Sequence, residues 1–235
     1  IGYSNKISEG EDKTPKFNTN MYAYFGKLED KSQLKASMKI IDTAWDQASK
    51  LIPKDKKLVI GALKEFDIRK EKYSESASSK SFGELATVFR AQKLDFYKDG
   101  LYYNFRNNVI KNLGKHLSNP DNLMYFLNTI YFYTYDDPRV KSTPCPYKLL
   151  VGTEQGPSNI KDVSSNADLK NILAVKKSKQ LTKIKFDYDN KGQSFNLHFQ
   201  WKDYKVKLPI TCRTRAAGGW QGKSLFMTTS GLKIS

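Results

Sequence analysis

The stretch that decides the fold is "SFNLHFQWK", Ser194–Lys202, in which apolar and polar residues alternate one by one. A period of two places successive side chains on opposite faces of a β-strand. One face of the predicted strand is therefore apolar and faces a core, whereas the other face is polar and faces solvent. The apolar face holds Phe195, Leu197, Phe199 and Trp201, and the polar face holds Asn196, His198, Gln200 and Lys202.

Strand-like segments flank this one on both sides. Residues 181–190 ("LTKIKFDYDN") precede it, and residues 204–215 ("YKVKLPITCRTR") and 223–234 ("KSLFMTTSGLKI") follow it. The segments "NKGQ" and "AAGGWQG" between them are typical of turns. A further strand is predicted over residues 147–153 and a short capped helix over residues 164–173. The sequence thus predicts a mainly antiparallel sheet in the C-terminal part of the chain.

The first half of the chain has helical rather than strand-like spacing. From Ser32 onward apolar residues recur at intervals of three and four, and Pro53 ends this first segment. The last such segment, "NLMYFLNTIYFYTY", is apolar almost all round, which is typical of a buried central helix. The predicted helices cover residues 32–52, 57–72, 82–96, 105–117 and 122–135.

This order of elements predicts an α+β fold. Residues 1–8 are predicted to form a strand and residues 9–20 a polar loop, after which helices come first and strands second. We expect a mainly helical region, residues 1–140, packed on a basic β-rich region, residues 141–235, with the two forming one compact unit.

The charge of the chain points to an anionic partner. Its 235 residues include 40 Lys and Arg against 24 Asp and Glu, which gives a net charge of +16 and a pI near 9.6. From Lys176 to Ser235 there are 13 basic and 3 acidic residues, a net charge of +10. Such an excess attracts phosphates or anionic lipid head groups. The predicted sheet therefore carries most of the positive field.

Other features narrow the class of protein. Cys145 and Cys212 are too few for a disulfide framework and have no metal-binding spacing, which favours the cytoplasm. The longest apolar run, near residues 123–135, is too short to span a bilayer, so no membrane partner is expected. The first residue is Ile1 rather than Met, and we expect an N-terminal piece upstream of it.

The segment "RTRAAGGWQGK", residues 213–223, has the composition of a polyanion clamp. Arg213 and Arg215 share one face of a strand by alternation, the glycines allow close backbone approach, Trp220 offers a stacking surface and Lys223 a point charge. These four residues are the predicted nucleic-acid contacts. The alternative is a two-stranded ribbon whose glycines serve the turn and whose tryptophan lies in the core.

An acid before a turn, followed by Q-x-K on the next strand, is found at Asp189, Gln200 and Lys202. This pattern resembles the restriction-endonuclease-like nucleases with their PD-(D/E)XK motif. The resemblance covers about sixteen residues and implies that Asp189 holds Mg²⁺ and that Lys202 helps to position or activate the attacking water, with all three residues in the catalytic site. The chain departs from the motif because no proline precedes Asp189 and glutamine stands in place of the second acid. The alternative is a half-buried hairpin with a polar outer side, on which His198 is a surface or hydrogen-bonded strand residue.

A second location for the same chemistry is "IGYSNK", residues 1–6. It has the apolar start and terminal lysine of the catalytic strand in the same family, with Ser4 in place of the second acid and Lys6 as the lysine; the metal-binding aspartate would lie upstream. The alternative is a plain edge strand.

Other chemistry finds little support in the sequence. The two histidines form no HExxH pair, and "GGWQGKS" lacks the glycine spacing of a phosphate-binding loop. Cys145 lies between prolines in a rigid loop, and the adjacent acids Asp136 and Asp137 point in different directions. Among the aromatic helical residues, we expect Tyr102, Tyr103 and Arg106 to be exposed.

The sequence therefore predicts a DNA-binding protein that acts as a metal-dependent, restriction-type DNA endonuclease, with DNA preferred over RNA and a homodimer left open. The alternative is a noncatalytic DNA- or RNA-binding accessory protein. A third class, a peripheral membrane or acidic-protein partner, fits the charge but lacks a basic amphipathic helix with a clean apolar stripe.

Overall fold

The structure is a computed structural model of the chain. It describes residues 2–7, 17–21, 25, 28, 30–68, 78–95, 101–131, 147–153, 156–161, 177–189, 192–213, 225–229 and 233–234. The predicted helix over residues 164–173 and the residues Asp136, Asp137, Cys145, Arg215, Trp220 and Lys223 lie outside these ranges.

Helices fill the first half of the described chain, as the periodicity predicts. They are α2 (Lys31–Ser49), α3 (Lys57–Ile68), α4 (Ser78–Ala91), α5 (Leu101–Leu117) and α6 (Pro120–Tyr131), with a short 3-10 helix at Ser178–Gln180. In the part of the chain that the structure describes, none of these helices is both long enough and apolar enough to cross a membrane.

Two of the helices begin at side-chain caps. The Asp30 carboxylate accepts hydrogen bonds from the backbone N–H groups of Ser32 and Gln33 at 2.9 and 3.0 Å, which satisfies two donors at the start of α2. These hydrogen bonds, from Gln33 first, lower the pKa of Asp30. The Asn119 side chain does the same for α6 by accepting from the N–H groups of Asp121 and Asn122. Each helix therefore starts where its sequence offers a short polar side chain.

The C-terminal part forms a six-stranded antiparallel sheet. Its order is β2-β8-β7-β6-β5, and β9 also pairs with β7. The strands are β2 (Phe17–Asn20), β5 (Leu181–Tyr188), β6 (Ser194–Trp201), β7 (Tyr204–Arg213), β8 (Phe226–Thr229) and β9 (Lys233–Ile234). Together with the five helices this sheet confirms the α+β fold class.

Strand β2 corrects the sequence prediction of a polar loop over residues 9–20. Phe17–Asn20 pairs with β8, with Thr19 opposite Met227. The segment "FNTN" has no apolar alternation, so its strand conformation follows from the free edge that β8 offers rather than from its own pattern.

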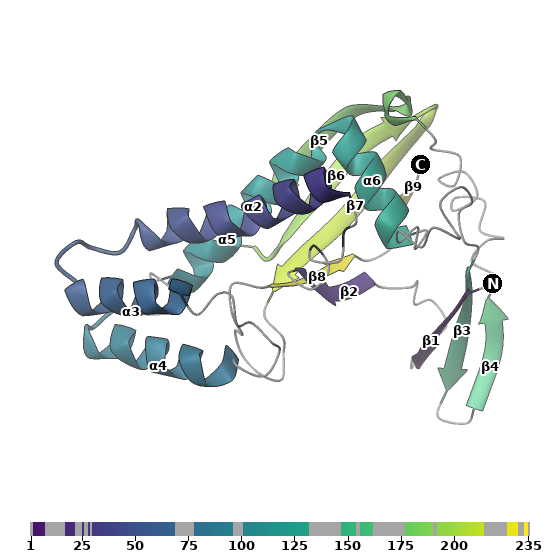
Figure 1. Cartoon of the computed structure of the whole chain (residues 1–235). Helices are drawn as coiled ribbons and strands as arrows, with labels where there is room; N and C mark the ends of the chain where they lie inside the picture. Colours follow the sequence, from purple (N-terminus) through teal and green to yellow (C-terminus); the bar gives the residue numbers. More distant parts are fainter. Residues whose placement is uncertain are drawn as a thin grey trace.

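A second, three-stranded sheet stands apart from the helices in Figure 1. Its order is β1-β3-β4, formed by β1 (Gly2–Ile7), β3 (Tyr147–Thr153) and β4 (Gly156–Lys161). Strand β1 pairs in parallel with β3 and lies at the edge of the sheet, as expected for residues 1–8.

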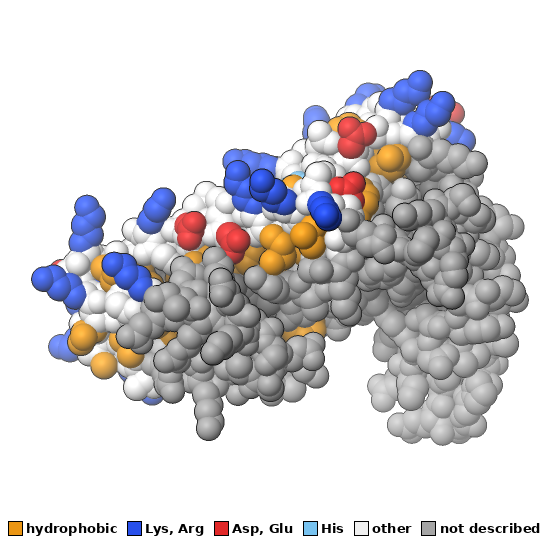
Figure 2. Space-filling model, viewed as in Figure 1, with side chains coloured by type: hydrophobic (Ala, Val, Ile, Leu, Met, Phe, Trp, Pro, Cys, Tyr) orange, Lys and Arg blue, Asp and Glu red, His pale blue; other side chains and the backbone are white. Residues whose placement is uncertain are grey.

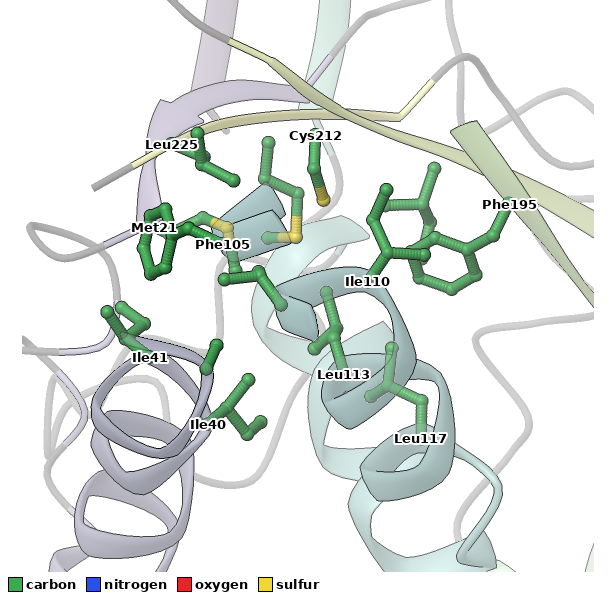
Figure 3. Close-up of a cluster of buried hydrophobic side chains, with 14 of the residues drawn as sticks. Met21, Ile40, Ile41, Phe105, Ile110, Leu113, Leu117, Phe195, Cys212 and Leu225 are labelled. Atoms are coloured by element: carbon green, nitrogen blue, oxygen red, sulfur yellow. The ribbon is translucent and has the colours of Figure 1, made fainter. Parts of the chain in front are cut away.

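Helices α2, α5 and α6 lie along one face of the main sheet (Figure 1). Helix α5 packs against β5 and β6, and α2 packs against α5. Figure 3 shows side chains of α5, such as Ile110 and Leu113, pointing toward Phe195 and Cys212 of the sheet. The alternation of β6 is confirmed, since Phe195, Leu197, Phe199 and Trp201 are all at most 4% exposed. The described helices therefore cover the apolar face of the sheet, and its polar face is turned away from them.

Helix α5 approaches the sheet most closely at Gly114. A Cβ atom added there would lie 2.6 Å from Cδ2 of Phe186 on β5, closer than real carbon atoms approach. Glycine at this position is therefore needed for α5 to pack on β5.

Two of the three residues expected to be exposed on α5 are buried in the structure. Tyr102 and Arg106 are each 4% exposed, and Tyr103 is partly buried. The carbon atom at the centre of the Arg106 guanidinium lies 4.6 Å from the centre of the Tyr103 ring, within range of a cation–π contact. The expectation was wrong for Tyr102 and Arg106 because this side of α5 faces the core.

Candidate nucleic-acid interface

The face of β5, β6 and β7 turned away from the helices is called the outer face here. Strand alternation places polar side chains on it because the apolar ones face α5 and α6. None of its side chains is fully buried. It holds Lys185 and Asp187 from β5, Asn196, His198 and Gln200 from β6, and Lys205, Lys207, Thr211 and Arg213 from β7.

The basic residues of the outer face lie in register across the strands. Lys185 is opposite His198, and His198 is in turn opposite Lys207. Two residue pairs along, at the next position on the same face, Lys205 is opposite Gln200. Since adjacent strands lie about 4.8 Å apart, Lys185 and Lys207 begin roughly 10 Å from each other with His198 between them. The three residues Lys185, His198 and Lys207 are called the basic row.

One acid, Asp187, lies beside this row. Its Oδ2 atom is 2.9 Å from Nε2 of His198, and its Oδ1 atom accepts hydrogen bonds from the side chain and backbone N–H of Asn196 at 2.9 and 3.1 Å. Burial alone would raise the pKa of Asp187, but the hydrogen bonds from Asn196 and His198 outweigh it and lower that pKa. The carboxylate is therefore ionised at neutral pH, and its contribution to stability is lost only as the pH falls through the lowered pKa. This arrangement confirms His198 as a hydrogen-bonded strand residue.

The structure does not bring Asp189 together with Gln200 and Lys202. Asp189 follows β5 at the turn, where Tyr188 is opposite Phe195, whereas Gln200 is opposite Thr182 at the other end of the hairpin. The part of β6 from Phe195 to Gln200 is roughly 17 Å long. In an antiparallel hairpin, only residues equally distant from the turn become neighbours, and Asp189 and Gln200 are not.

Gln200, on β6, lies close to Lys202, which is in the turn after that strand. Lys202 follows the end of β6 in the left-handed region, at φ 52°. Its carbonyl accepts a hydrogen bond of 3.0 Å from the Gln200 side chain, and its Nζ lies 4.8 Å from the centre of the Trp201 ring. These contacts stabilise the turn between β6 and β7. Because Asp189 is distant, the three residues as placed do not fit a Mg²⁺ site, and the described residues contain no group of three or more His, Cys, Asp or Glu side chains that could hold a metal ion.

Of the four predicted clamp residues, the structure describes Arg213. It is exposed at the end of β7, opposite Phe226 of β8. The predictions for Arg215, Trp220 and Lys223 fall outside the described residues. Arg213 thus belongs to the same outer face as the basic row.

Two other reactive side chains lie away from the outer face, Cys212 in the core and His116 half-buried on α5. Burial raises the pKa of the Cys212 thiol to about 12, so that it is neutral and unreactive in the core. His116 lines a small indentation with Asn122 and Gln33, with space for about one water molecule. Burial lowers the pKa of His116, and its Nδ1 atom lies 3.2 Å from the Asn122 amide, which donates to the neutral ring. Neither residue has room beside it for a substrate.

Asp187 is the residue of this surface that the sequence interpretation missed. The signal was present, because Lys185 and Asp187 alternate with Ile184, Phe186 and Tyr188 just as the polar residues of β6 alternate with its apolar ones. The pairing of Asp187 with His198 depends in addition on the strand register, which the sequence does not specify.

No protein-family model, no curated protein and no solved structure matches the chain.

Proposed function

We propose that this chain is a nucleic-acid-binding protein, with DNA preferred, and that the outer face of β5–β7 holds the phosphate backbone. The observation that carries the proposal is the gathering of basic side chains on one exposed sheet face with a single acid among them. These basic side chains are Lys185, Lys205, Lys207 and Arg213, of which Lys207 is half-buried and the others exposed.

The composition of this face suits a phosphodiester chain. Lysine and arginine contacts to phosphate supply most of the non-specific affinity of proteins for nucleic acids. Threonine, asparagine and glutamine side chains, which the outer face also presents, donate hydrogen bonds to phosphate and sugar oxygens. The antiparallel sheet holds the backbone positions of these side chains at fixed spacing. Binding therefore has to restrict less conformational freedom.

The helical side of the molecule is a weaker candidate for the phosphate-binding surface. Figure 2 shows lysine and arginine side chains along the described helices with acidic side chains among them. On α2, the exposed residues Lys31, Lys35 and Lys39 are followed by Asp42 and Asp46. Charges of mixed sign produce a smaller net potential than the outer face does.

Binding to a labelled 20-base-pair DNA duplex in EDTA, measured over a series of salt concentrations, tests this proposal. We expect the logarithm of the affinity to fall linearly with the logarithm of the salt concentration, with a slope near −3 to −4 if each of the four basic side chains neutralises one phosphate. Affinity that does not change with salt, or no binding even at about 20 mM salt, would contradict it. A single-stranded RNA competitor separates a DNA-preferring protein from a general accessory protein, because only the latter would lose the duplex to RNA at equal concentration.

The second candidate activity is Mg²⁺-dependent cleavage of the bound DNA, centred on β1. The observation that favours β1 is the position of its lysine. Lys6 lies within a strand two residues after Ser4, so the two positions share one face of β1, whereas Lys202 lies outside β6 in a turn. The catalytic-strand resemblance requires the lysine on the strand. Conversion of supercoiled plasmid in Mg²⁺, beside an EDTA control, tests this step.

A further inference from the structure

His198 lies at the centre of the basic row, and a hydrogen bond to Asp187 orients its ring. Its Nε2 atom contacts Oδ2 of Asp187 at 2.9 Å, while Lys185 and Lys207 lie directly opposite it on the two neighbouring strands. The side chain of His198 is 43% exposed and that of Asp187 is 59% exposed. The imidazole is thus oriented by the protein and still open to a ligand.

The bond to Asp187 fixes which ring nitrogen carries the proton. An ionised carboxylate can only accept a hydrogen bond, so Nε2 of His198 must be the donor. In the neutral ring the other nitrogen, Nδ1, then has a lone pair and no proton. When the ring gains a second proton, that proton goes to Nδ1, which becomes a charged donor.

We propose that the basic row is a phosphate-binding site whose occupation is coupled to protonation of His198. A phosphate oxygen is repelled by the lone pair of the neutral ring and accepts a charge-assisted hydrogen bond from Nδ1 of the imidazolium. Lys185 and Lys207, one on each side, contact the same phosphate or the phosphates next to it. Binding of the phosphodiester therefore takes up one proton at His198.

The charges that face His198 set the direction of this coupling. From β5 they are Lys185 and Asp187, and from β7 they are Lys207 and, two residue pairs away, Lys205. The neighbours of His198 on the same face of β6, Asn196 and Gln200, are neutral. Asp187 is the one negative charge among these groups, and the three lysines are positive. A bound phosphate offsets the lysine charges and therefore favours the protonated ring. The protonated ring in turn favours binding of the phosphate. Histidine is the side chain whose charge changes between pH 5 and 8, where this coupling is measurable.

This inference rests on the proposed function, because the phosphate is taken to be that of a nucleic acid. The affinity of the chain for a labelled DNA duplex is measured between pH 5.5 and 8 at constant ionic strength in EDTA, with circular dichroism at each pH to verify folding. For the unmodified chain we expect affinity about tenfold or more higher at pH 5.5 than at pH 8, the range of one charged hydrogen bond. In His198→Gln we expect most of this pH dependence to be lost, because the side chain that takes up the proton is gone.

The chain provides a matched control, because His116 is its only other histidine. His116→Gln removes the same kind of side chain from a half-buried position on α5 and is expected to keep the pH dependence of the unmodified chain. Asp187→Asn is expected to bind more tightly at pH 8 and to show a shallower pH dependence, since it removes a negative charge and no longer fixes the proton on Nε2.

The outcomes separate this inference from the proposed function. If His198→Gln binds DNA with an unchanged pH dependence, the basic row has no proton-coupled site, while DNA binding by the chain stands. If the pH dependence disappears in His116→Gln instead, the coupling belongs to His116 and the inference is wrong. If the unmodified chain binds no duplex at any pH, both proposals fail.

Discussion

The double variant Lys185→Glu/Lys207→Glu is expected to bind duplex DNA about 100-fold more weakly than the unmodified chain at roughly 0.1 M salt. Each substitution removes one phosphate contact and places a negative charge where a phosphate would lie. Both positions are on the outer face and neither side chain is fully buried, so folding should be retained. The slope of the salt dependence should also become shallower by about two. Fluorescence anisotropy with a labelled duplex at several salt concentrations measures both quantities.

A second double variant with the same change in net charge tests whether the loss of binding is specific to the outer face. Lys35→Glu/Lys39→Glu changes the net charge by the same amount on the exposed side of α2, in the helical layer. We expect this pair to weaken binding by no more than about threefold, the effect of distant, screened charges. Equal losses in the two double variants would show that the field of the whole chain, rather than the outer face, attracts DNA.

Cleavage provides the second large effect. If the chain cuts plasmid DNA in Mg²⁺, Lys6→Ala is expected to lower the rate of cleavage by about 100-fold or more, the contribution typical of a residue that activates or positions an attacking water. Asp189→Ala/Lys202→Ala is expected to leave the rate within about threefold, because these residues do not converge in the structure and Lys202 serves a turn. Conversion of supercoiled to nicked and linear plasmid over time, with EDTA blanks, measures both rates.

The same two variants can also show that the cleavage site lies in the β5–β6 hairpin rather than on β1. Loss of cleavage in Asp189→Ala/Lys202→Ala, together with retention in Lys6→Ala, would contradict the β1 location and support the hairpin. Duplex binding by each variant is measured in parallel, because a defect in binding would lower the cleavage rate without any role in the chemistry.

The helices and the central strands could be predicted because their buried residues recur with the period of a helix or of a strand. The apolar positions recur every two residues along β6 and every three or four residues along α2, and most of them are buried in the structure. The same reasoning could not predict β2, since "FNTN" lacks a pattern of its own and gains its strand conformation from the edge of β8. Local periodicity predicts an element only where the element itself has a buried face.

The candidate site shows a different limit. A separation of eleven residues between Asp189 and Gln200 allows many registers, and the turn after β5 selects the one in which Gln200 meets Thr182. The same register brings Asp187 to His198, which no spacing rule indicated. The amphipathic position of Arg106 on α5 was also ambiguous, because a long side chain can bury its guanidinium against Tyr103. The sequence could predict which residue types line the candidate site. Which of them become neighbours depends on the register of strand pairing.

The central claim is that the outer face of β5–β7 holds the phosphate backbone, and lysine labelling tests it most directly. The chain is acetylated under mild conditions with and without saturating duplex DNA, and the labelled residues are quantified by mass spectrometry. We predict that DNA protects Lys185, Lys205 and Lys207 while Lys31, Lys35 and Lys39 on α2 remain as reactive as in the free chain. Protection of the α2 lysines with unchanged labelling of the outer face would contradict the account.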